Sequence, residues 1–243
     1  MNSALPLNGI RVLDSTYVFA LPYAGGLLAD MGAEVIKVEG PRRPDTTRSG
    51  GFSGAYPENE LGDDWWNRPS TYNLLHRGKQ SLTLDMTDPK GRELFMELVK
   101  VSDIVMENFT PRVIKNFGLE YEDLRKIKPD IIMVSSTGYG FYGPWNSYGA
   151  TGPATEGAAG LAYQTGYVGG GPVMSEIPYT DYTAAEQTVF AVMTALMHRL
   201  RTGQGQFVDI SQTQAASATM PEALLDFAAN GRTEPRIGNS DSG

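Results

Sequence analysis

The sequence of 243 residues predicts an α/β fold with a mainly parallel sheet and flanking helices. Short β-branched runs alternate with amphipathic stretches along the chain, which is the order expected of strand–helix–strand units. The first two runs, at residues 10–13 and 34–38, are spaced for one right-handed parallel crossover. Glycine, proline and capping residues stand at predicted helix ends, where such residues start or stop helices.

The first part of the chain is predicted as a strand, a helix and a second strand. Residues 10–13 are a short apolar run, and residues 22–31 have helical composition and end at Gly32, which suits the position after a helix. Residues 34–38 are rich in β-branched side chains. Residues 40–78 are then irregular, with many glycine, proline, serine, asparagine and aromatic residues. A long irregular stretch inside a domain is usually functional or mobile.

From residue 81 the alternation of strands and helices resumes. The pairs at 88–89 and 110–111 each place a capping side chain before a proline, which is a helix start. Gly118 and Pro129 stop two of the helices. The predicted elements are strands at 81–85, 104–106 and 131–135 and helices at 89–101, 111–118 and 121–128.

The C-terminal third combines glycine-rich loops with further helices. The loops cover residues 138–153 and 166–178, and a short helix is expected between them at 154–163. A strand at 206–210 and a last helix at 213–229 close the predicted elements. A long amphipathic helix is predicted at 183–201, because apolar side chains recur at helical spacing and are expected in the core: Val189, Val192, Met193, Leu196 and Leu200.

The composition excludes several kinds of site. Cysteine is absent, so the chain has no disulfide, thiolate metal site or cysteine nucleophile. The two histidines, His76 and His198, are too few for a multi-histidine metal site, and no metal is predicted. A net charge of −8 argues against a nucleic-acid surface. No apolar run approaches the ~20 residues of a membrane span, and the N-terminus lacks signal-peptide features, so a cytoplasmic protein is predicted.

The loop after the first strand carries no dinucleotide fingerprint. Such a site needs glycines directly after the strand, whereas residues 14–20 read Asp-Ser-Thr-Tyr-Val-Phe-Ala. The glycines at 169–171 precede no helix start at the required spacing. Asp14 only weakly resembles a phosphatase nucleophile, because Thr16 stands where that loop carries its second acid. Neither dinucleotide binding nor phosphate-ester hydrolysis is therefore favoured.

Basic side chains gather around the irregular stretch. Such a cluster supplies the charge-assisted hydrogen bonds that a bound phosphate needs. It also fits a solvated loop with scattered charges, and spacing alone does not separate the two interpretations. The cluster consists of Lys37, Arg42, Arg43, Arg48, Arg77 and Lys79.

Asp181 lies between a glycine-rich loop and the long predicted helix. A helix N-terminus favours a carboxylate there, and this is also the setting of an ordinary N-cap aspartate. The position equally suits a nucleophile, because an aspartate is ionised near neutral pH and needs no partner base to attack an acyl carbonyl. The local pattern leaves both interpretations open.

Five sequence blocks, which follow one another along the chain in the family's order, resemble the family III CoA-transferases. This group includes formyl-CoA and carnitine CoA-transferases. The block at 76–86 matches the family pattern N-R-G-K-x-S-x-x-L-D, except that His76 replaces the usual asparagine. The block at 201–211, Arg-Thr-Gly-Gln-Gly-Gln-Phe-Val-Asp-Ile-Ser, is the most specific, and the resemblance covers nearly the whole chain. The other matching segments are residues 7–14 with 32–39, 103–109 with 118–119, and 138–140 with 143–144.

The resemblance implies transfer of CoA from an acyl-CoA donor to a carboxylic acid, with both as substrates and no permanently bound cofactor. In the family the catalytic aspartate lies just ahead of the long helix, and Asp181 matches that position. Its carboxylate would attack the donor thioester to give a mixed anhydride, and the released thiolate would convert the anhydride into an aspartyl-CoA thioester. Glycine-rich loops can present the N–H donors that each oxyanion needs.

Matching positions also imply the CoA contacts. They fall in the loop after the first strand and at the ends of later strands, namely Val18, Phe19, Ala20, Leu84, Asp85, Met86, Asn108 and Phe109. Lys37, Arg48 and Lys79 are the predicted phosphate or neighbouring contacts. Asn116 replaces an arginine that contacts CoA in some members, and Phe19 replaces a glutamine of formyl-CoA transferase. A shifted CoA and an acceptor other than oxalate are therefore expected.

Family members are longer than this chain, with a small second domain and interlocked dimers. We therefore predict an α/β CoA-binding domain at 1–211, followed at 212–243 by a linker helix and tail that lead to a second domain absent from the chain. An interlocked homodimer, or a hetero-oligomer with a related subunit, is the expected assembly. Aromatic side chains of the irregular stretch would pack in that interface, which we prefer, or line a substrate pocket: Tyr56, Trp65, Trp66 and Tyr72.

Two other functions stay open from the sequence. An acyl-CoA racemase of the same fold needs a histidine–aspartate pair. The position that would carry the histidine falls near Thr151, and neither His76 nor His198 is close to it, so this alternative is disfavoured. A non-catalytic subunit that binds CoA or completes an oligomer would fit the short length. The presence of Asp181 argues against such a subunit.

Overall fold

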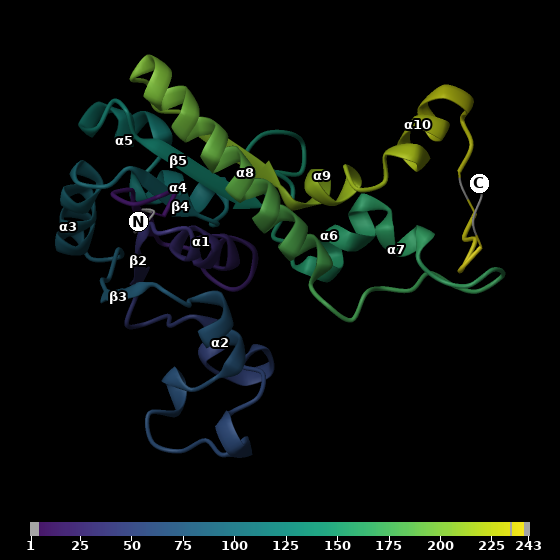
Figure 1. Ribbon diagram of the computed structural model, residues 1–243, viewed down its shortest axis with the longest axis horizontal. Helices are drawn as coiled ribbons and strands as arrows, with labels where there is room; N and C mark the ends of the chain where they lie inside the picture. Colours follow the sequence, from purple (N-terminus) through teal and green to yellow (C-terminus); the bar gives the residue numbers. More distant parts are fainter. Residues whose placement is uncertain (1–4, 234, 241–243) are drawn as a thin grey trace.

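Six parallel strands form one sheet in the order β3-β2-β1-β4-β5-β6 (Figure 1). The chain enters at β1 in the middle, moves outward to β3, and returns to pair β4 with the other side of β1. The structure is a computed structural model that describes residues 5–233 and 235–240. The first four residues, which are predicted to lack signal-peptide features, and the end of the predicted tail lie outside the described residues. The strands are β1 Arg11–Asp14, β2 Glu34–Glu39, β3 Gln80–Thr83, β4 Ile104–Glu107, β5 Ile132–Thr137 and β6 Phe207–Ser211.

Helices cover both faces of this sheet, which confirms the predicted α/β fold. Parallel strands buried on both faces carry apolar side chains in succession, and neighbouring Val12 and Leu13 belong to the cores of opposite faces. On one face α1 (Ala20–Asp30) and α8 (Tyr179–Thr202) pack on the sheet. On the other face lie α3 (Pro89–Lys100), α4 (Pro111–Phe117) and α5 (Tyr121–Ile127).

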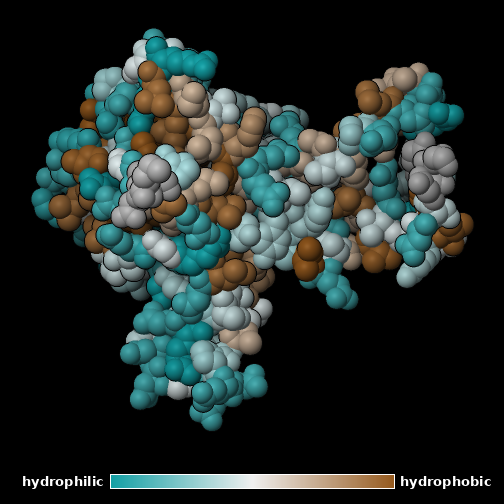
Figure 2. Space-filling view, in the orientation of Figure 1, coloured by the Kyte–Doolittle hydropathy of each residue, from teal (hydrophilic) through white to brown (hydrophobic). Residues whose placement is uncertain are grey.

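Two segments extend away from the sheet (Figure 1). The first joins β2 to β3 and contains four short 3₁₀ helices, Thr46–Arg48, Gly50–Phe52, Pro57–Asn59 and Trp65–Asn67, before α2 at Ser70–Leu75. Its surface is mainly hydrophilic (Figure 2). The second contains α6 (Gly152–Ala159), α7 (Leu161–Gln164), α9 (Gln212–Ser217) and α10 (Pro221–Asn230). Within the described residues, no helix has both the length and the apolar character needed to cross a membrane.

Several predicted helix boundaries are wrong, each for a local reason. Helix α8 begins at Tyr179, so Asp181 lies inside its first turn rather than before the helix. The predicted helix at 213–229 is two helices, because Pro221 opens α10 as a new helix. Gly160, with φ of 88°, likewise separates α6 from α7. Leu200 is 79% exposed, because the last turns of α8 extend past the sheet, so its assignment to the core is wrong.

Gly205 lies where α8 turns into β6, and a Cβ there would come within 1.9 Å of the Ile131 carbonyl oxygen. We predict that Gly205→Ala pushes the start of β6 away from β5 and lowers the free energy of unfolding by about 1–3 kcal/mol. Urea denaturation measures this change. Gly157→Ala in α6 is the control, because nothing lies within 4 Å of its Cβ position, and it should not destabilise the protein. Equal unfolding midpoints for the two variants would contradict the packing account.

Candidate active site

Asp181 lies where the starts of several helices meet. Ala20 opens α1, Ala184 is in the first turns of α8, and Ala215 is in α9, and these three side chains form one buried cluster. Alanine allows this close approach because its side chain is a single methyl group. Gly152, the first residue of α6, has no side chain, and a Cβ there would lie 2.5 Å from the Asp181 Oδ2 atom.

Asp181 is 8% exposed, and two donors face its carboxylate. The Nε2 atom of Gln212 donates to Oδ1 at 3.1 Å, and the backbone N–H of Ala20 is directed at the carboxylate and lowers its pKa. Phe19 precedes α1 without a side-chain capping bond. Asp181 therefore supplies, from a different helix, an acceptor at the N-terminus of α1, where anionic groups are favoured.

Burial raises the pKa of Asp181 to about 6, although the hydrogen bonds from Gln212 and Ala20 oppose that rise. The sequence-based expectation of an ordinary aspartate pKa is thus replaced by a raised one. At pH 7 a group with this pKa is still ionised by about ten to one. The N-cap interpretation is wrong, because Pro178 is the N-cap of α8 and Asp181 is the third helical residue. Asp181 is therefore a mostly buried, mainly ionised carboxylate.

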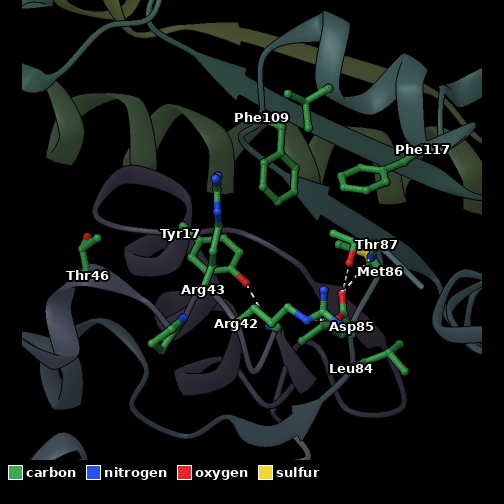
Figure 3. A pocket seen from close by; sticks show the side chains of 14 residues that line it. Tyr17, Arg42, Arg43, Thr46, Leu84, Asp85, Met86, Thr87, Phe109 and Phe117 are labelled. Carbon is green, nitrogen blue, oxygen red and sulfur yellow. Dashed lines mark hydrogen bonds and ion pairs between the residues drawn. The ribbon is translucent and has the colours of Figure 1, made fainter.

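A pocket of about 860 Å³ opens at the C-terminal ends of the central strands (Figure 3). Its wall includes Tyr17 after β1 and Phe109 after β4, so it lies at the switch point between these two neighbouring strands, where open α/β sheets bind ligands. Figure 3 shows Phe109 and Phe117 on one side and Leu84 and Asp85 on the other. The lining residues also include Val38, Gly40, Arg42, Arg43, Pro44, Thr46, Met86, Thr87 and Val113.

Four of the eleven predicted CoA contacts line the pocket, namely Leu84, Asp85, Met86 and Phe109. Asn108 lies behind it, where its side-chain amide accepts from the Tyr17 N–H at 2.9 Å and donates to the Tyr17 carbonyl at 2.7 Å. The residues after Tyr17, namely Val18, Phe19 and Ala20, lead from the pocket wall to Asp181. Three residue steps span at most about 11 Å.

The three predicted phosphate contacts are instead placed in ion pairs. The side chains of Lys37 and Lys79 are each 1% exposed, and they face Asp45 at 3.9 Å and Asp14 at 2.7 Å. Arg48 pairs with Glu39 at 2.7 Å. The basic residues that line the pocket are Arg42, 3.4 Å from Asp85, and Arg43. The pairing of Asp14 also closes the weak phosphatase interpretation, because its side chain is fully buried.

Gln212 and Gly152 are site residues that the sequence reasoning missed. Gln212 was expected at the start of a linker, yet α9 packs with buried Ala215 and Ala216 and places Gln212 on Asp181. The sequence did contain a signal for Gln212, because this residue directly follows β6, the strand at the end of the family-specific block at 201–211. Within residues 5–233 and 235–240, no group of three or more His, Asp or Glu side chains is arranged to hold a metal ion.

The arrangement suits nucleophilic chemistry by a carboxylate. Burial removes the water that would otherwise stabilise its charge, and backbone N–H groups at a helix start are ready donors for a developing oxyanion. Residues 7–243 match the family model described as CoA-transferase family III. The chain belongs to CoA-transferase family III. The match confirms the resemblance inferred from the sequence blocks.

Relatives in this family are similar to almost the whole chain. Succinate–glutarate CoA-transferase of Agrobacterium fabrum is 36% identical over 239 residues, covering 98% of this chain and 59% of the relative. Succinyl-CoA:glutarate CoA-transferase of Homo sapiens is 34% identical, covering 99% and 52%. The β subunit of succinyl-CoA–L-malate CoA-transferase of Chloroflexus aurantiacus is 33% identical, covering 98% and 56%. The chain thus spans little more than half the length of these relatives.

Solved structures of the family share the fold. A CaiB/BaiF family protein from Brucella suis is 33% identical with a TM-score of 0.88, covering 98% of this chain and 61% of its own. A hypothetical protein from Mycobacterium tuberculosis is 30% identical with a TM-score of 0.83, covering 95% and 61%. The six-stranded sheet with its flanking helices is therefore the family fold.

The raised pKa of Asp181 predicts a pH-dependent stability. In the unfolded chain an aspartate titrates near about 3.9, whereas in the fold the pKa of Asp181 is about 6. The folded state binds the proton more tightly, so this group's stabilisation is present at low pH and is lost as pH rises through about 6. We expect Asp181→Asn to be more stable than the unmodified protein by roughly 1–3 kcal/mol at about pH 8. The difference should shrink toward about pH 5.

Urea denaturation at the two pH values measures this difference. Asp63→Asn is the control, because Asp63 is exposed and its change should leave the pH dependence as it was. Equal free energies of unfolding for Asp181→Asn and the unmodified protein at about pH 8 would show that burial does not destabilise the ionised Asp181 carboxylate, and would contradict the raised pKa.

Proposed function

We propose that this chain carries the nucleophile and the CoA-binding surface of a CoA-transferase, which moves CoA from an acyl-CoA donor to a carboxylic acid. The observation that carries the proposal is the Asp181 carboxylate, which is buried, accepts a hydrogen bond from Gln212 and faces the Ala20 N–H. Ala20 is three residue steps along the chain from Tyr17, which lines a pocket at the switch point of the sheet. Membership of CoA-transferase family III supports the same activity.

CoA is long and has an anionic end and a thioester end, and the site offers a matching surface for each. The nucleotide end would occupy the pocket, with its phosphates near Arg42 and Arg43. The thioester end would follow Val18, Phe19 and Ala20 to Asp181. The other proposed contacts are Leu84, Asp85, Met86, Asn108 and Phe109. Lys37, Arg48 and Lys79 are assigned to the ion pairs that fix the pocket walls.

The first step forms a mixed anhydride. An Asp181 carboxylate oxygen attacks the thioester carbonyl carbon of the donor, a C–O bond forms, and the C–S bond breaks with release of CoA thiolate. Negative charge develops on the former carbonyl oxygen, and backbone N–H groups at the start of α1 would donate to it. Asp181 enters this step ionised, as its pKa of about 6 requires near neutral pH.

The second step moves CoA onto the protein. The thiolate attacks the Asp181 carbonyl carbon of the anhydride, a C–S bond forms, and the bond from that carbon to the bridging oxygen breaks. The donor acid leaves as a carboxylate with that oxygen. An acceptor carboxylate then attacks the aspartyl-CoA thioester, and the same two steps in reverse give the new acyl-CoA and restore Asp181.

The acids and the assembly are inferred from the relatives. The names of two similar proteins contain glutarate together with succinate or succinyl-CoA, so short dicarboxylic acids are the first acceptors to test. One relative is named as a β subunit, which supports a related subunit that completes the site, and a homodimer is the alternative assembly. A cytoplasmic location stays the prediction made from the sequence.

Covalent trapping tests the proposed function. The protein is incubated with succinyl-CoA and then with hydroxylamine, which attacks the aspartyl carbonyl and leaves a hydroxamate that peptide mass spectrometry locates. We expect the hydroxamate on Asp181 and none in Asp181→Asn, while Asp63→Asn is labelled like the unmodified protein. A folded protein that binds CoA and gives no label at Asp181 would refute the assignment of the nucleophile to this chain.

The proposed phosphate contact predicts a loss of CoA affinity. Arg43→Gln removes a guanidinium from the pocket edge, and one charge-assisted hydrogen bond contributes about 1.5–3 kcal/mol. We therefore expect the Kd for CoA to rise at least about tenfold, with a weaker dependence on salt, as measured by isothermal titration calorimetry. Arg125→Gln on α5 is the matched control outside the pocket. Unchanged affinity in Arg43→Gln would place the phosphates elsewhere.

A further inference from the structure

Val18 adopts a backbone conformation that a β-branched residue rarely takes. Its φ is 65°, in the left-handed region that favours glycine. The residue lies two positions before Ala20, whose N–H contacts Asp181. Phe19 returns to a right-handed conformation, with φ of −104° and ψ of −70°. The left-handed residue therefore sets the direction in which the chain enters α1, and with it the aim of the Ala20 N–H.

A buried carboxylate holds Val18 in this conformation. The Oδ2 atom of Asp45 accepts the Val18 N–H at 3.1 Å, and the Asp45 side chain has no exposed surface. On the preceding residues, Asn108 bonds both the N–H and the carbonyl of Tyr17, and the Lys37 ammonium donates to the Thr16 carbonyl. Side chains thus hold the backbone of Thr16 and Tyr17, which precede the left-handed residue, and of Val18 itself.

Asp45 is itself held on several sides. Its Oδ1 atom accepts from the N–H and the hydroxyl of Thr47, at 2.9 and 2.7 Å. The Lys37 ammonium lies 3.9 Å from Oδ2, and the Nε2 atom of His76 lies 3.5 Å from it. The Val18 N–H therefore shares Oδ2 with the Lys37 ammonium and the His76 ring. Asp45 belongs to the segment that joins β2 to β3. Among the hydrogen bonds described above, that segment is linked to the Asp181 site through Val18.

We propose that Asp45 is a positioning residue: it holds Val18 in the left-handed conformation so that the Ala20 N–H meets the Asp181 carboxylate. The proposal rests on the proposed function, in which Asp181 is the nucleophile. Asp45 does not touch the reacting atoms, and its effect passes through Val18. Valine is disfavoured in this conformation, so the loop should change shape when the Asp45 carboxylate is removed.

Rescue by glycine distinguishes positioning from a general structural role. Asp45→Ala should slow the labelling of Asp181 by succinyl-CoA and hydroxylamine about 10²-fold, because small misplacements of reacting groups cost rates of that order. Adding Val18→Gly should recover at least about tenfold, since glycine adopts positive φ without strain. Val18→Gly alone should lose a few-fold, because it loosens the same loop.

A matched glycine substitution serves as the control. Asp64 also has a positive φ, 53°, but lies in the exposed segment before Trp65. Asp64→Gly relieves the same kind of strain elsewhere, so it should not rescue Asp45→Ala. If Asp45→Ala does not fold, as circular dichroism shows, Asp45→Asn replaces it in every arm. A double variant no faster than the Asp45 variant alone would overturn the proposal, as would an Asp45 variant with the unmodified rate.

A second readout separates this proposal from the proposed function. Carbon-13 NMR follows the titration of Asp181, which faces Gln212 from α9, Gly152 from α6, the Ala20 N–H from α1 and, on its own helix, the tyrosine Tyr182. Loss of the Ala20 N–H should raise the pKa of Asp181, whereas loss of the Asp45 charge alone would lower it. We expect a rise in Asp45→Ala and a return in the variant that adds Val18→Gly.

The two readouts can fail separately. If the unmodified protein gives no label, the proposed function fails, and the NMR titration still decides the positioning of the Ala20 N–H. If labelling is normal in the unmodified protein but the pKa of Asp181 is unchanged or lower in Asp45→Ala, the positioning proposal fails and the nucleophile assignment stands.

Discussion

The carboxylate of Asp181, in one helix, faces the first N–H of another helix. A carboxylate removed from water needs hydrogen-bond donors in place, and a helix N-terminus needs acceptors. Asp181 in α8 and Ala20 in α1 meet both needs at once. The contact is possible only because the helices approach closely, which the alanine cluster and Gly152 allow. The chemistry proposed for Asp181 depends on this contact, since it holds the carboxylate while leaving it mainly ionised.

The sheet topology determines where this contact lies relative to the pocket. Because the strand order reverses between β1 and β4, the loops that follow them diverge around a crevice. Asn108, after β4, bonds the backbone of Tyr17, after β1, and so joins the two loops. The chain then runs from Tyr17, in the pocket wall, to Ala20, which faces Asp181, in three residue steps. One loop therefore connects the pocket to Ala20, which faces Asp181, and this is the arrangement that the proposed long substrate with one reactive end requires.

Much of the fold could be predicted from the sequence, because strand and helix periods and capping residues are local signals. The Asp88 cap is an example, since its side chain accepts from the Lys90 N–H at 2.7 Å. Partners distant in sequence could not be predicted. Lys37 and Lys79 looked like phosphate ligands because their aspartate partners come from other elements. Gln212 was missed for the same reason, because its partner Asp181 lies in another helix. Leu200 was wrongly assigned to the core, because apolar periodicity does not show where a helix extends past the edge of the sheet.

The central claim is that Asp181 is acylated and then carries CoA, and oxygen transfer tests it most directly. An acceptor acid labelled with oxygen-18 in its carboxylate forms an anhydride through one labelled oxygen. When CoA thiolate then attacks the acceptor's acyl carbon, that oxygen stays on Asp181. The protein is given succinyl-CoA and labelled glutarate, and mass spectrometry follows the peptide that contains Asp181. Our account predicts one oxygen-18 in that peptide after a single turnover. Transfer of CoA with no label in Asp181 would contradict it.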